Sequence, residues 1–187
     1  MLIPKNRTAR GSLFALIFLA MVSGGYYLVI FGNGNFHAVT PGEAYRCAQP
    51  SYSRLEKYVK QYGIKSVINL RGKNTGVSWY SDETRFCMIN GVKHYDIALS
   101  ATHKPTPQQL NEILTVIRTA PRPVLIHCKA GSDRSGLVAA MWKVLVDGQT
   151  KPEADNQLSI RFGHFDIGGT AAMDSFFMAW HPQTVNP

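Results

Sequence analysis

The segment from His127 to Gly136 holds the residues best suited to chemistry in this chain. It reads HCKAGSDRSG and places Arg134 six positions after Cys128, with Gly131 between them. The apolar run Pro123–Ile126 before the segment predicts a strand, and the residues after Arg134 predict a helix. A loop between a strand and the first turn of a helix points backbone N–H groups into one concavity, where the helix dipole adds positive potential. The sequence therefore predicts a phosphate-binding loop with a cysteine at its base.

Each residue type in this loop has a chemical reason. The field of such a loop favours thiolate over thiol, so Cys128 is predicted to be the nucleophile. Arg134 can pair two phosphoryl oxygens at once and stabilise the charge of the transition state. Ser135 can donate a hydrogen bond to the sulfur and assist its departure when the phosphoenzyme is hydrolysed. The other loop residues are predicted to bind the substrate: His127, Lys129, Ala130, Gly131 and Ser132.

The spacing between the cysteine and the arginine is a weak signal by itself. The other two cysteines show this, because Ser53 and Lys93 stand at the same distance after Cys47 and Cys87. The complete block is more specific, since it adds histidine before the cysteine, an internal glycine and Ser-Gly after the arginine. On this block the chain resembles the cysteine-dependent protein tyrosine phosphatase superfamily, in particular its dual-specificity branch. The HCKAG opening resembles that of lipid phosphatases of the phosphatase-and-tensin type.

The resemblance covers Phe36 to about Trp180. It implies a phosphomonoester hydrolase that needs no metal or cofactor and works through a phosphocysteine intermediate on Cys128. Phosphorylated proteins, lipids and inositol phosphates are the candidate substrates. Lys129 and the apolar segment near the N-terminus slightly favour a lipid or another polyanion as the substrate. Two alternatives come from other classes: a redox thiol enzyme and a non-catalytic phosphate-binding module.

The residue that protonates the leaving oxygen stays open. Dual-specificity phosphatases usually use an aspartate about thirty residues before the cysteine, and Asp96 lies 32 residues before Cys128, inside a predicted strand. The loop Ser100–Pro105 holds no carboxylate, and His103 is its only residue able to act as an acid. Asp133 lies inside the cradle, and its pairing with the next arginine resembles that of myotubularin-like and Sac-type phosphoinositide phosphatases. We favour Asp133, then Asp96, then His103.

A second arginine is expected near the loop. Arg71 follows the apolar strand Ser66–Leu70. The carboxyl ends of parallel strands meet at one edge of a sheet, where binding sites form. Arg71 is therefore predicted to support the loop or to attract substrate, although a surface arginine in a turn is an equal alternative.

A membrane anchor is expected near the N-terminus. Residues 13–31 form a 19-residue stretch without charge, which matches the thickness of a bilayer as a helix. Lys5, Arg7 and Arg10 precede it, so the positive-inside rule keeps residues 1–12 in the cytoplasm and sends the phosphatase domain, residues 36–187, outward. In a bacterium this places catalysis in the periplasm. A cleaved signal peptide is the alternative, with Val22–Gly24 as small residues for processing.

The charge of the chain limits its partners. The net charge is +8, and residues 32–187 keep 17 basic and 12 acidic residues. This modest excess suits anionic substrates, and no cluster of basic residues indicates nucleic-acid binding. In an oxidising compartment Cys47 and Cys87 could form a disulfide, but two unrelated thiols are the commoner case.

The pattern of the chain predicts a single α/β domain with a mainly parallel sheet flanked by helices. A strand that starts at Ala44–Arg46 is expected at a sheet edge, and residues 32–35 form the expected linker. The predicted helices and further strands alternate along the rest of the chain: helices at 53–62, 79–90, 106–119, 135–146, 153–162 and 172–179, and strands at 66–70, 92–97 and 123–126.

Overall fold

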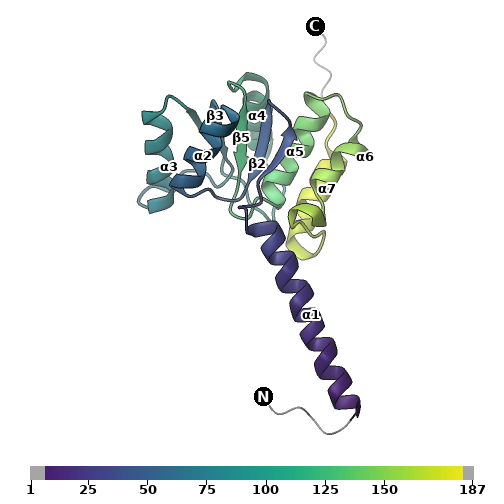
Figure 1. Cartoon of the computed structure of the whole chain (residues 1–187). Helices are drawn as coiled ribbons and strands as arrows, with labels where there is room; N and C mark the ends of the chain where they lie inside the picture. Colours follow the sequence, from purple (N-terminus) through teal and green to yellow (C-terminus); the bar gives the residue numbers. More distant parts are fainter. Residues whose placement is uncertain (1–6, 183–187) are drawn as a thin grey trace. The chain divides into compact units, whose positions relative to one another are not determined.

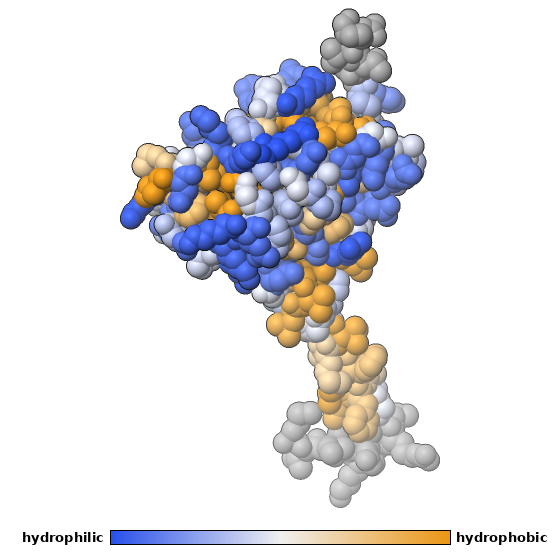
Figure 2. Space-filling model, turned by 45° about the horizontal axis from the view of Figure 1, so that its top comes forward, coloured by the Kyte–Doolittle hydropathy of each residue, from blue (hydrophilic) through white to orange (hydrophobic). Residues whose placement is uncertain are grey.

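The computed structural model describes residues 7–182. It divides the chain into two units, Met1–Asn33 and Gly34–Pro187. The first unit consists of the helix α1, Arg7–Phe31, whose part Gly11–Phe31 is long and apolar enough to cross a membrane. Its apolar surface is exposed over most of its length, as the orange colour in Figure 2 shows. A signal sequence would have the same length and composition. Lys5, which contributes to the predicted orientation, lies outside the described residues.

The second unit is built on a five-stranded sheet with the order β1-β2-β5-β3-β4 (Figure 1). Only β1 is antiparallel to its neighbour, so the predicted, mainly parallel sheet is confirmed. Ile68 and Ile126 face one side of the sheet, whereas Val67 and Leu125 face the other, as the period of two requires. The strands are β1 His37–Thr40, β2 Ala44–Cys47, β3 Ser66–Asn69, β4 Lys93–Asp96 and β5 Val124–His127.

Helices cover both faces of the sheet. α2 and α3 pack on the Val67 side, and α4, α5 and α7 pack on the Ile68 side. Local signals start and stop several of them: the side chain of Ser51 caps α2, Gly63 ends it in the left-handed conformation, and Thr106 opens α4 with a capping box. The helices are α2 Tyr52–Tyr62, α3 Ser78–Ile89, α4 Pro107–Thr119, α5 Asp133–Leu145, α6 Lys151–Ala154 and α7 Ala171–Ala179.

Two predictions about the elements are wrong. The strand that begins at Ala44 is not an edge strand, because β1 pairs with its outer side. The helix predicted at 153–162 breaks up into α6 and the short 3₁₀ turns Asp155–Gln157 and Ile160–Phe162. At this break the carbonyl of Gln157 accepts a hydrogen bond from Arg46 (2.6 Å).

All three cysteines are free and buried. Cys47 and Cys87 lie in the same apolar cluster as unpaired thiols, so the optional disulfide between them is absent from the described structure. Cys47 is in register with His127 on the neighbouring strand. Burial raises the pKa of Cys47 well above its ordinary value, so this residue is a protonated thiol.

Candidate active site

The predicted phosphate loop lies at the carboxyl end of the central strand β5. It runs from Cys128 to Ser132, and α5 begins at the next residue. The neighbouring strands β2 and β3 flank β5 on its two sides, so the loop is enclosed by their ends. This is the strand, loop and helix arrangement that the sequence predicts, and it directs the N-terminus of a 13-residue helix at the loop.

The carbonyl groups of the loop are held by hydrogen bonds from the surrounding elements. Gln49 N–H donates to the Lys129 carbonyl (3.2 Å), and the side-chain amide of Asn35 donates to the Ala130 carbonyl (3.0 Å). Leu70 N–H donates to the His127 carbonyl (2.9 Å). Of the amide groups of the loop, that of Gly131 donates to Cys128 Sγ (3.2 Å). Asn35, which ends the predicted linker, is therefore part of the framework of the site.

A buried arginine completes this framework. Arg46 donates through one guanidinium nitrogen to the carbonyls of Gly131 (2.9 Å) and Ser132 (2.8 Å), and it stacks over the ring of Phe162. Burial lowers the pKa of Arg46 to about 10, although Cys128 and Asp133 oppose this shift, so it remains charged at neutral pH. Gly131 has a φ of +76°, and a Cβ there would lie 2.5 Å from the backbone of Ala48, which explains why this position is glycine.

The predicted nucleophile lies at the base of the loop. Cys128 is 1% exposed, and its Sγ accepts a hydrogen bond from Gly131 N–H (3.2 Å). Arg134 lies across the loop and donates to the carbonyls of Leu70 (3.3 Å) and Leu99 (3.2 Å). Arg134 Nε, Ser132 Oγ and Ser135 Oγ are buried and have no hydrogen-bond partner among the described residues. The same holds for Arg46 Nε, His127 Nδ1 and Asp155 Oδ1. The nitrogen of Arg134 and the two serine hydroxyls are therefore donors that are free to bond to a ligand or to water.

Glu83 organises the side of the loop that faces α3. Its carboxylate bonds with His127 Nε2 (3.1 Å), His94 Nε2 (2.9 Å) and Gln49 Nε2 (2.8 Å). Burial alone would raise the pKa of Glu83, but the two histidines outweigh burial and lower it to about 2. Gln49 in turn accepts a bond from Arg71 Nη1 (3.0 Å). No local pattern in the chain marks this network, because its members come from five separate segments.

The Glu83 network predicts a dependence of stability on pH. Because its pKa is depressed, Glu83 stabilises the fold above its ordinary value of 4.5, and this contribution is lost as the pH falls toward about 2. We expect Glu83→Gln to lower the melting temperature at pH 7 and to flatten the decline of that temperature below pH 4.5. Circular dichroism of the detergent-solubilised chain measures both. The matched control is Glu56→Gln on the exposed pair with Lys60, which should change neither; equal effects of the two variants would contradict the assignment.

Arg71, which is predicted to support the loop or to attract substrate, has two fixed neighbours. Its guanidinium stacks on the ring of Trp79 at 3.7 Å and bonds to Gln49, so two contacts fix its direction. Burial and the nearby Arg134 lower the pKa of Arg71, while Cys128 opposes this shift. The arginine is therefore close enough to the loop to act on an anion bound there.

The three candidate acids have different surroundings. Asp96 accepts bonds from Asn69 Nδ2 (2.8 Å) and Tyr80 Oη (2.6 Å), so both of its oxygens are engaged. His103 is exposed on the loop after Leu99, where its Nδ1 lies 3.0 Å from Ser100 Oγ. Asp133 opens α5 directly beside Arg134, and its Oδ1 lies 2.8 Å from Nδ1 of a buried histidine, His164.

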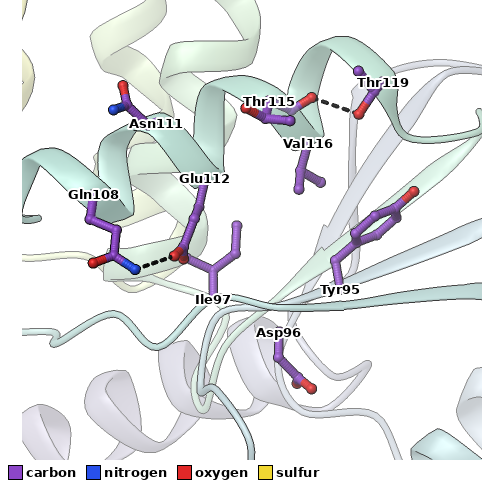
Figure 3. Close-up of a pocket in the computed structure, with 9 residues that line it drawn as sticks. All are labelled: Tyr95, Asp96, Ile97, Gln108, Asn111, Glu112, Thr115, Val116 and Thr119. Atoms are coloured by element: carbon purple, nitrogen blue, oxygen red, sulfur yellow. Dashed lines mark hydrogen bonds between the residues drawn. The ribbon is translucent and has the colours of Figure 1, made fainter.

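A cavity of about 660 Å³ lies away from the phosphate loop, between β4 and α4 (Figure 3). Tyr95 and Ile97 point toward α4, whereas Asp96 points to the other side of the sheet (Figure 3). None of the residues that line this cavity belongs to the segment from His127 to Gly136. Of the candidate acids, Asp96 alone lines this cavity, and the residues of the phosphate loop do not.

Among α/β domains, a buried thiol beneath inward-facing amides, with an arginine at the start of the following helix, is the arrangement of cysteine-dependent phosphatases. The family follows from the match of residues 35–175 to a family model: the chain belongs to the family described as DSP-PTPase phosphatase fused to NAD+ kinase. The prediction of a dual-specificity-like member of the cysteine-dependent phosphatases is confirmed.

Several known proteins are similar to this chain. The inositol diphosphatase SIW14 of Saccharomyces cerevisiae is 27% identical over 107 residues, which are 54% of this chain and 36% of that protein. The dual specificity protein phosphatase TpbA of Pseudomonas aeruginosa is 48% identical over 48 residues, 23% of this chain and 22% of that protein. The matches thus span less than two fifths of these curated relatives.

Solved structures share the fold. The core catalytic domain of the SIW14 phosphatase superposes with a TM-score of 0.65 at 19% identity, covering 80% of this chain and 87% of that one. The TpbA crystal structure gives 0.57 at 23% identity, covering 78% and 90%. At these identities the likeness establishes the α/β phosphatase fold and nothing finer.

Proposed function

We propose that this protein hydrolyses phosphomonoesters through a phosphocysteine intermediate on Cys128. The observation that carries the proposal is the set of unpartnered buried donors, Arg134 Nε and the hydroxyls of Ser132 and Ser135, around a thiol that already accepts an amide N–H. Cys128, Gly131 and Ser132 belong to the loop, and Arg134 and Ser135 belong to the first turn of α5 that follows it.

The reaction proceeds in two halves. The Cys128 sulfur attacks phosphorus, Arg134 and the loop amides hold the equatorial oxygens, and an acid protonates the leaving oxygen. Water then attacks the phosphocysteine, and the sulfur departs with a hydrogen bond from Ser135. We assign the acid to Asp133, with Asp96 and His103 as the alternatives. His127, Lys129, Ala130, Gly131 and Arg71 are the remaining residues assigned to substrate binding.

Protein and inositol phosphates are the first substrates to test, since TpbA is a dual specificity protein phosphatase and SIW14 an inositol diphosphatase. The experiment is a phosphate-release panel on the purified chain with a chelator present. It contains an aryl phosphate, phosphotyrosine and phosphoserine peptides, inositol phosphates and phosphatidylglycerophosphate. Release that depends on Cys128 supports the proposal, and the preferred substrate separates a protein phosphatase from a phosphatase of lipids or inositol phosphates. No release from any of these substrates would favour the non-catalytic phosphate-binding module.

We further propose that α1 is an uncleaved anchor, that residues 1–12 lie in the cytoplasm, and that residues 36–187 form a periplasmic phosphatase domain. Arg7 and Arg10 at the start of the helix support this orientation. When the chain is expressed in a bacterium, we expect protease added to spheroplasts to digest the domain while a tag at the N-terminus stays protected. A cytoplasmic marker protein is the control for intact membranes. A domain that resists protease until the membrane is lysed would reverse the orientation.

A further inference from the structure

A buried histidine links the phosphate loop to a second carboxylate. His164 is 2% exposed and follows the 3₁₀ turn Ile160–Phe162. Its Nδ1 lies 2.8 Å from Asp133 Oδ1, and its Nε2 lies 2.9 Å from Asp174 Oδ2. Both ring nitrogens are therefore engaged by carboxylates, and the ring cannot rotate without losing both bonds.

The three groups come from three elements and form one row. Asp133 is the first residue of α5, directly after the phosphate loop, and Asp174 lies in the first turn of α7. The side chains of Asp133 and Asp174 are 19% and 18% exposed, whereas that of His164 is 1% exposed. The row thus leads from a carboxylate at the reacting centre, through a ring shielded from water, to a second carboxylate near the surface.

We propose that His164, oriented by Asp174, is a positioning residue that supplies Asp133 with the proton it delivers to the leaving oxygen. The role rests on the proposed hydrolysis at Cys128 with Asp133 as the acid. In a Ser-His-Asp triad, a carboxylate holds a histidine in one tautomer, and the histidine first accepts a proton. Here Asp174 holds His164 in the same way, but His164 first gives a proton.

The proton movements balance over the two halves of the reaction. While the S–P bond forms and the P–O bond breaks, the leaving oxygen takes a proton from Asp133, which takes one from His164 Nδ1. The ring becomes neutral and keeps its Nε2–H bond to Asp174. While water forms a new P–O bond and the S–P bond breaks, the proton lost by water returns through Asp133 to His164, and the starting state is restored.

The charges around His164 suit this role. Asp133 on α5 and Asp174 on α7 face its two nitrogens, and Asp155 from the neighbouring 3₁₀ turn adds a third acidic group. Burial alone would lower the pKa of His164, but the hydrogen bonds to the first two carboxylates outweigh burial and raise it. The two carboxylates therefore favour the protonated ring, which is the state that a proton supply needs. Arg46 is the cation that acts on Asp133 from the loop side.

We call the proton path from His164 through Asp133 to the leaving oxygen the relay. The relay and a salt bridge with only a structural role predict different kinetics. A structural bridge holds Arg134 in place, so its loss slows every substrate alike. A proton supply matters only where the leaving oxygen needs protonation, so its loss spares a substrate with a good leaving group. It also changes the pH range of activity, because the proton supply no longer comes from His164, whose pKa the two carboxylates raise.

The test uses His164→Gln and Asp174→Asn in the full-length, detergent-solubilised chain. We expect kcat/KM for an alkyl phosphate to fall about tenfold to a hundredfold in both variants, and that for an activated aryl phosphate to fall less than about threefold. The basic limb of the pH profile for the alkyl phosphate should move to lower pH in His164→Gln. The double variant His164→Gln with Asp133→Asn should be no slower than Asp133→Asn alone, because the two residues act in one chain.

The matched control is Asp147→Asn, which removes an ion-paired carboxylate beyond the other end of α5. It should leave both substrates and the pH profile unchanged. Vanadate binding shows that each variant keeps its loop. Equal losses on both substrates, an unmoved basic limb, or multiplied losses in the double variant would overturn the relay. Turnover that survives Cys128→Ser would instead overturn the proposed function, so the two failures are distinguishable.

Discussion

Replacing Cys128 by serine is expected to lower turnover at least ~10⁴-fold while phosphate and vanadate still bind. The serine hydroxyl has about the same size as the thiol, but at neutral pH it is neither ionised nor a comparable nucleophile. The groups that hold the anion are not changed: the carbonyls of the loop stay bonded to Arg46, and Arg134 stays bonded to Leu70 and Leu99. Phosphate release and isothermal titration with vanadate measure the two properties separately.

A second cysteine provides the control for this experiment. Cys87 is also buried, on α3 in the apolar cluster that holds Val67 and Leu125. Cys87→Ser places a hydroxyl in that cluster and should lower the melting temperature while turnover is retained. Appreciable turnover in Cys128→Ser would contradict covalent catalysis and would leave binding as the only function of the loop.

Local signals account for much of what the sequence predicts correctly. The cap at Thr106, the periodicity of the helix that follows it, and the stop at Gly63 are each written within a few residues. The phosphate loop is also predicted from a local signal, because the strand, the glycine and the start of the helix follow one another in the chain. Such features need no partner from elsewhere in the chain to be recognised.

The remaining features of the site depend on contacts between distant segments. Arg46 bonds to Gly131, 85 positions away, and Asn35 bonds to Ala130, 95 positions away. No periodicity or motif marks such pairs, and an arginine in a short strand is ordinarily read as exposed. β1 has only four residues and is not among the predicted strands, so β2 was expected at an edge although it lies between β1 and β5. His164 lies between two 3₁₀ turns, beyond the end of the helix expected at 153–162, so no predicted element placed its ring beside Asp133 and Asp174.

The geometry of the site bears directly on the choice between the candidate acids. Both oxygens of Asp96 accept hydrogen bonds, from Asn69 and Tyr80, so a proton carried by this carboxylate would compete with those bonds. His103 is exposed and lies on a loop held by local hydroxyl contacts. Asp133 combines a place directly after the phosphate loop with a bonded partner in His164, so we retain it as the acid.

We expect Asp133→Asn to slow hydrolysis of an alkyl phosphate by about a hundredfold to ten-thousandfold, and that of an activated aryl phosphate far less. An oxygen that leaves readily needs little protonation, so only the poor leaving group reports the loss of the acid. Asp96→Asn and His103→Ala, measured in parallel on the same two substrates, are the comparison. The leaving-group-dependent loss should appear in one variant alone. If it appears in Asp96→Asn and not in Asp133→Asn, the enzyme uses the ordinary dual-specificity arrangement, and the hydrogen bond between Asp133 and His164 serves only to hold Arg134 in place.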